Sequence, residues 1–170
     1  RTLALLWLVP TLLLFLLRYV FDKQDMVFNA VGPSLIALFP FLTMFLVTSV
    51  ATQRERSDGT LERLMRLPLG KAGYVFGYAI AFSLMAIIQA AIVTTVSFNW
   101  LGLSIDGSAG LLFLMTLLVA VLGVSLGLAA SALAKTEFQA VQFMPLIVMP
   151  QFLLCGLLVA RDQMAEVLKT

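Results

Sequence analysis

The chain has 170 residues, of which 61% are hydrophobic and 12% are charged, with a mean hydropathy of +1.03. Soluble domains carry about a quarter charged residues, and one core of this size cannot bury so much apolar surface, so a soluble globular domain is excluded. The net charge of +2 argues against nucleic-acid binding, the single Cys155 excludes an intramolecular disulfide, and there is no histidine. We therefore predict a membrane protein with no metal site, no cofactor and no nucleic-acid partner.

Five apolar stretches are long enough to cross a bilayer, because a hydrocarbon core of roughly 30 Å needs about 20 helical residues. Lipid offers no partners to unpaired backbone groups, and the stretches lack the alternation of a barrel. We expect an all-α membrane protein, a polytopic transmembrane helix bundle that forms a single domain over residues 1–170. The expected spans are about 3–21, 27–51, 74–97, 110–134 and 139–160.

The connections between these spans predict the orientation. Residues 52–73 form the one long polar connection, whereas residues 99–110 form a glycine-rich loop. If residues 52–73 face the cytoplasm, that side holds the excess of lysine and arginine that cytoplasmic loops carry. We therefore expect a multi-pass protein of the plasma membrane whose N-terminal end is cytoplasmic.

The two ends of the chain bear on the expected number of spans. The chain starts at Arg1 with apolar sequence and finishes in a polar tail. Five spans leave the two ends on opposite faces of the membrane. We therefore expect a piece of a longer protein, with a sixth span beyond Thr170.

The polar connection contains a predicted short helix. Leu61, Leu64 and Met65 fall at positions i, i+3 and i+4, which gives a small apolar face. Glu62 is well placed to satisfy amide groups of the first turn, and Pro68 ends the helix. About eight residues are too few for a helix that is alone in water, so the ends of the spans or a partner protein must pack on it.

This connection resembles the first cytoplasmic loop of type-2 ABC transporter permeases, the membrane subunits of drug, antibiotic and polysaccharide exporters. The resemblance lies in residues 54–56 (RER), 59–64 (GTLERL) and Pro68. It implies a coupling helix that sits in a cleft of the ABC ATP-binding subunit and passes nucleotide-driven movement to the spans. The partner-binding residues that it implies are Glu55, Gly59, Thr60, Leu61, Glu62, Leu64 and Met65. The alternative is a solvated basic turn that only sets topology.

Small residues mark where helices can approach closely. Gly123, Gly127 and Ser131 recur at a spacing of four residues, and Gly73 and Gly77 begin a similar stripe. Such stripes pack either within the subunit or between two permease subunits, because the resemblance implies a homo- or heterodimer.

Polar residues are few within the spans. Gln89, Thr94, Gln142 and Gln151 either line a substrate path or form hydrogen bonds between helices. Phenylalanine, methionine and leucine dominate the rest, which favours a lipophilic or amphipathic substrate in contact with membrane lipid. The leading interpretation is thus the permease of an ABC exporter, such as a multidrug efflux pump.

The sequence contains no site for ATP hydrolysis. The Gly70–Lys71 pair is followed by Ala72 and lacks the earlier glycine of a phosphate-binding loop. We therefore expect no enzymatic activity in this chain and an ATPase on a separate subunit. A secondary transporter is disfavoured because the span interiors carry no ionisable residue, whereas a membrane scaffold or assembly protein remains an alternative.

Overall fold

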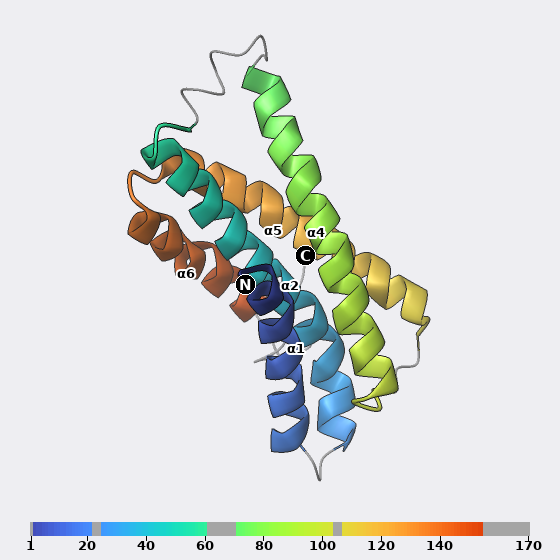
Figure 1. The fold of residues 1–170 in the computed structure, drawn as a ribbon. Coiled ribbons are helices and arrows are strands. Elements are labelled where there is room, and N and C mark those ends of the chain that lie inside the picture. Colours follow the sequence, from blue (N-terminus) through green and yellow to red (C-terminus); the bar gives the residue numbers. More distant parts are fainter. Residues whose placement is uncertain (1, 22–24, 61–70, 104–106, 155–170) are drawn as a thin grey trace.

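The computed structural model describes residues 2–21, 25–60, 71–103 and 107–154, and no strand occurs in those ranges. The chain forms an all-α bundle, which confirms the expected fold class (Figure 1). Its helices are α1 (Thr2–Val20), α2 (Asp25–Ser57), α4 (Lys71–Asn99), α5 (Ala109–Leu133) and α6 (Glu137–Leu154).

Three helices in the described part are long and apolar enough to cross a membrane. The crossing stretches are Val31–Ser57 in α2, Ala72–Asn99 in α4 and Ala109–Leu133 in α5. A shorter apolar stretch, Trp7–Val20, lies in α1. The chain is therefore a multi-pass membrane protein, and the count of five spans stays a prediction.

Helix α2 is the centre of the bundle. It packs against α1, α4, α5 and α6. In Figure 1, α1 lies along the half of α2 that comes first in the sequence, and α6 lies along the half that comes last. Any movement of α2 therefore reaches every other helix directly.

Helices α2 and α5 approach each other closely at Gly123 and Gly127. A Cβ atom placed on Gly123 would lie 2.6 Å from the carbonyl oxygen of Phe41, and one on Gly127 would lie 2.7 Å from that of Phe45. The backbones of the two helices meet there because glycine has no side chain to separate them. Of the two alternatives left open by the sequence, these glycines serve packing within the chain.

Larger side chains fill the bundle on either side of this contact. One cluster, which includes Leu14, Phe28 and Ile36, joins α1, α2 and the loop after α4. That loop folds back onto the bundle, where Leu101 and Leu103 are buried, and its reversal is made at Gly102 with a φ of +65°. A second cluster, which includes Met44, Ala86 and Val124, packs the middle of α2 against α4 and α5.

We predict that Gly123→Ala and Gly127→Ala destabilise the protein in detergent by about 1–3 kcal/mol each, because a methyl group there collides with backbone atoms. The matched control is Gly77→Ala on α4, where an added Cβ would meet nothing within 4 Å. Thermal unfolding in one detergent compares the three variants. Helix propensity alone favours alanine over glycine at all three positions. Losses at Gly123→Ala and Gly127→Ala no larger than that of Gly77→Ala would therefore contradict the α2–α5 contact.

Candidate functional site at the end of helix α2

Helix α2 continues into the segment that the sequence assigned to a polar connection. It ends at Ser57, so that residues 52–57 are helical. The hydroxyl of Ser57 donates hydrogen bonds to the carbonyls of Gln53 and Arg54, and Gly59 then adopts a φ of +72°. A left-handed glycine after the last turn is a common way to end a helix. The last turn therefore carries three charged residues in succession: Arg54, Glu55 and Arg56.

Glu55 joins α2 to α4. Its carboxylate accepts a hydrogen bond from the hydroxyl of Tyr78. The ring of Tyr78 lies against that of Tyr74, one turn earlier in α4, with centroids 4.5 Å apart. A hydrogen bond to a charged acceptor is stronger than one between neutral groups, so this contact ties the end of α2 to the beginning of α4.

Arg56 joins the same turn to α5. Its Nη1 atom donates to the carbonyl oxygens of Ser131 and Ala132, each at 3.2 Å. The last carbonyls of a helix lack partners within the helix and carry partial negative charge. Arg56 therefore caps α5, and two successive residues link α2 to two different helices.

Arg54 differs from both neighbours. Its Nε atom lies 3.9 Å from a carboxylate oxygen of Asp58, and both side chains are largely exposed. Exposed pairs of this kind contribute little to stability. Arg54 thus provides a natural control for changes at Glu55 and Arg56.

The structure places only some of the predicted partner-binding residues. Glu55 contacts α4, Gly59 is half-buried and Thr60 is exposed just beyond the end of α2. Leu61, Glu62, Leu64 and Met65 lie outside the described residues. Sequence reasoning missed Arg56 and Tyr78, although a Tyr74–Tyr78 pair at a spacing of four residues near the start of a span was a visible signal.

The four predicted substrate-path residues do not form one surface. Gln89 is fully buried, and its Nε2 atom donates to the hydroxyl oxygen of Thr43 on α2 at 2.6 Å. Thr94 is buried, and its hydroxyl has no hydrogen-bond partner among the described residues. Gln142 is exposed on α6, and the side chain of Gln151 lies outside the described residues. For Gln89, the structure thus shows a hydrogen bond between helices.

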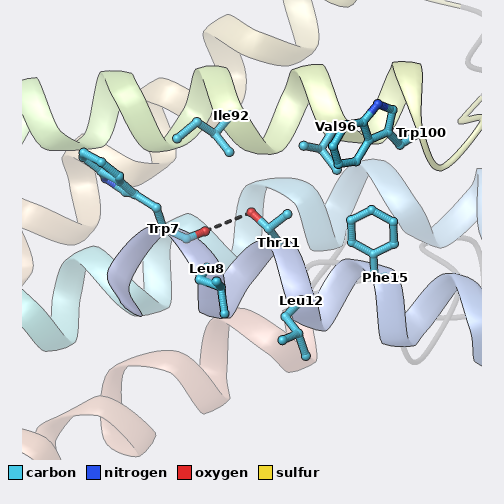
Figure 2. A pocket seen from close by; sticks show the side chains of 8 residues that line it. All are labelled: Trp7, Leu8, Thr11, Leu12, Phe15, Ile92, Val96 and Trp100. Carbon is cyan, nitrogen blue, oxygen red and sulfur yellow. Dashed lines mark hydrogen bonds between the residues drawn. The ribbon is translucent and has the colours of Figure 1, made fainter. Parts of the chain in front are cut away.

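A groove of about 530 Å³ lies between α1 and α4 (Figure 2). Thr11 is the one hydroxyl residue in its lining. Its hydroxyl donates to the carbonyl of Trp7 within α1 at 2.9 Å, so this proton is not available to a ligand in the groove. The other lining side chains are aliphatic or aromatic, and they offer an apolar surface. They are Trp7, Leu8, Leu12, Phe15, Ile92, Val96 and Trp100.

The described helices form a bundle with charged residues gathered at one end of its central helix. Comparison with known families gives the class of protein: the chain matches the ABC-2 type transporter family over residues 1–170. The chain therefore belongs to the ABC-2 type transporter family, and the resemblance to type-2 ABC permeases is confirmed.

Curated relatives agree with this family. The chain is 29% identical over 127 residues to ABC transporter G family member 20 of Dictyostelium discoideum. It is 32% identical over 126 residues to the probable multidrug ABC transporter permease YbhR of Escherichia coli K12. These alignments cover 75% and 74% of the chain but only 17% and 34% of the two relatives, so the chain spans about a third of their length or less. No solved structure matches the chain significantly.

We predict that Glu55 and Tyr78 are energetically coupled. In a double-mutant cycle, Glu55→Gln and Tyr78→Phe should together cost less than the sum of their separate effects, by about 1–2 kcal/mol. Thermal unfolding in detergent measures each corner of the cycle. Tyr19→Phe is the control, because Tyr19 is 82% exposed; strictly additive losses from Glu55→Gln and Tyr78→Phe would contradict the contact.

Proposed function

We propose that this chain is the membrane-spanning part of an ABC exporter permease. It moves a lipophilic or amphipathic substrate with energy from ATP hydrolysed by a separate ATP-binding subunit, and it has no enzymatic activity of its own. Membership of the ABC-2 type transporter family supports the class. The relative from Escherichia coli is named a probable multidrug permease, which supports multidrug efflux as the kind of transport.

The observation that carries this proposal is the pair of links from the end of α2. The connection that resembles a coupling loop leaves α2 directly after Ser57. Just before this point, Glu55 accepts a hydrogen bond from α4. The next residue, Arg56, donates hydrogen bonds to α5. A movement of the connection therefore acts on α2, α4 and α5 together. Such a link suits the transmission of movement from an ATPase to the spans.

The packing of α2 determines how that movement spreads. Gly123 and Gly127 seat α5 directly on the α2 backbone, and tightly packed interfaces of this kind transmit strain with little deformation. By contrast, α2 and α4 meet through side chains. Met44 packs near Ala86 in one apolar cluster, and hydrogen bonds run from Tyr78 to Glu55 and from Gln89 to Thr43. We propose that α2 and α5 move as one body during transport.

The partner surface is proposed on the connection itself. Leu61, Leu64 and Met65 form the apolar contact with the ATP-binding subunit, and Glu62 orders the start of the coupling helix. Gly59 and Thr60 lead into that helix. Glu55 does not touch the ATP-binding subunit in this proposal, but it links α2 to α4 through its hydrogen bond with Tyr78. The N-terminal end is then cytoplasmic, the protein lies in the plasma membrane, and two permease subunits pair as a homo- or heterodimer.

The substrate class follows from the lining of the groove between α1 and α4. Its aromatic and aliphatic side chains suit an apolar molecule that arrives through lipid. The charged residues within the three crossing stretches gather at the end of α2. An ion-coupled secondary transporter usually carries such residues deep inside the membrane, which favours the ABC exporter.

We predict that two variants affect different steps. One weakens binding of the ATP-binding subunit, and the other weakens the link between substrate and ATP hydrolysis. Leu64→Ala should weaken capture of the ATP-binding subunit, because apolar side chains near the centre of a small interface carry much of its energy. Tyr78→Phe should leave capture unchanged and lower substrate-stimulated ATP hydrolysis several-fold, because it releases α4 from the end of α2. Both quantities are measured on the complex reconstituted in liposomes.

Arg54→Gln is the matched control, since Arg54 is exposed and belongs to the same turn of α2. It should preserve capture of the ATPase and its stimulation by substrate. If Leu64→Ala and Tyr78→Phe both behave like the wild-type protein, the connection is only a topology signal. Capture of the ATPase without any transport would instead indicate a scaffold.

A further inference from the structure

A second pocket, of about 450 Å³, lies where the end of α2, the beginning of α4 and the end of α5 meet. It is separate from the groove between α1 and α4, with which it shares no lining residue. Its polar side chains include Arg56, Tyr74 and Ser125, and its apolar side chains include Phe76, Leu128 and Ala129. A pocket with one polar and one apolar part suits an amphipathic ligand.

The charge of the pocket defines the headgroup of such a ligand. Arg56 is the one charged residue among the described residues that line it, and no carboxylate lines it. The two hydrogen bonds from Arg56 to α5 both use Nη1. A guanidinium carries five N–H donors in a planar fork, so further donors remain for an anion.

Tyr74 lines the same pocket from α4. Its ring packs against Tyr78, and its hydroxyl is buried beside that residue. Tyr74 therefore adds an aromatic surface next to Arg56, and the guanidinium supplies the donors for an anion.

The rim of the pocket is apolar. Phe76 is 66% exposed and Val75 is 50% exposed, and both line the pocket from α4. Exposed apolar side chains on a helix long enough to cross a membrane suit contact with acyl chains. Lys135, exposed just beyond the end of α5, adds positive charge to the same end of the bundle.

We propose that this pocket binds an anionic phospholipid from the adjoining leaflet, with the phosphate at Arg56 and an acyl chain along Phe76 and Leu128. Basic pockets between transmembrane helices recognise anionic headgroups in this way. The phosphate accepts hydrogen bonds from those Arg56 donors that do not bond to α5. Because the lipid binds the folded bundle, it stabilises the junction of α2 and α5 by linkage. This site depends on the bundle lying in a membrane and not on the proposed transport function.

The test titrates the purified protein in a neutral detergent with dioctanoyl phosphatidylglycerol and with dioctanoyl phosphatidylcholine. Native mass spectrometry measures bound lipid, and thermal unfolding measures stabilisation. We expect the anionic lipid to bind about tenfold more tightly, the equivalent of roughly 1.4 kcal/mol, and to raise the Tm more. Equal binding and stabilisation by the two lipids would overturn the proposal.

Two pairs of variants assign the binding to this pocket. Arg56→Gln should abolish the preference for the anionic lipid, whereas Arg54→Gln, outside the pocket, should retain it. Ala129→Leu fills the apolar part and should weaken binding of phosphatidylglycerol by about tenfold. Its control, Ala81→Leu on the exposed face of α4, should not. If Arg56→Gln does not fold, the test rests on Ala129→Leu and Ala81→Leu. Equal affinity of these two variants for phosphatidylglycerol would overturn the proposal.

Glycerol 3-phosphate, the headgroup without chains, separates lipid from free anion. It should bind far more weakly than phosphatidylglycerol, because it lacks the contacts with Phe76 and Leu128. Binding as tight as that of the lipid would assign the pocket to a soluble anion and contradict the proposed phospholipid.

Discussion

The contact between α2 and α5 at Gly123 and Gly127 is the constraint on which the rest of the bundle depends. An added Cβ at either glycine would lie closer than 3 Å to a carbonyl oxygen of α2, so the distance between the two helices is fixed by backbone atoms. The ends of these helices then come together, which lets Arg56 reach the last carbonyls of α5. The same junction forms one wall of the pocket that contains Arg56 and Ser125.

Around this contact, the other helices are held differently. Helix α1 packs on the first half of α2 through Leu14 and its apolar neighbours. Helix α4 packs on α2 through apolar side chains such as Met44 and Ala86, and it also makes two polar contacts with α2, one at Gln89 within the bundle and one at Tyr78 near its end. Polar contacts can exchange partners, whereas backbone packing between glycines and carbonyls has no such freedom. We infer that α4 and α1 change position relative to a fixed α2–α5 pair.

Much of this fold could be predicted from the sequence. The apolar runs predicted the helices because lipid forces backbone groups to pair within a segment, and the spacing of Gly123 and Gly127 predicted a close helix contact. The predicted span stops at residue 51, whereas helix α2 continues to Ser57, because hydropathy reports where lipid ends and not where a helix ends. The charged residues 54–56 extend the helix beyond the apolar run.

The site was less predictable because it depends on residues far apart in the chain. Glu55 matched a family motif, but its bond to Tyr78 joins positions 23 residues apart. Arg56 was visible as a charge, but its bonds to Ser131 and Ala132 require the crossing of α2 and α5. Likewise, Gln89 and Gln142 have the same side chain, and only the packing of their helices buries the first and exposes the second.

The central claim, that α2 and α5 move as one body when the ATP-binding subunit acts on the connection, is tested most directly by distance measurements. Spin labels at Ser57 and Leu133, both exposed at the ends of α2 and α5, are introduced with Cys155 replaced by serine. Electron–electron double resonance on the complex compares the nucleotide-free and ATP-bound states, beside a second pair at Ser57 and Leu12 on α1. If α2 and α5 move as one body, the distance between Ser57 and Leu133 stays unchanged and the distance between Ser57 and Leu12 changes. A shift between Ser57 and Leu133 on ATP binding would contradict it.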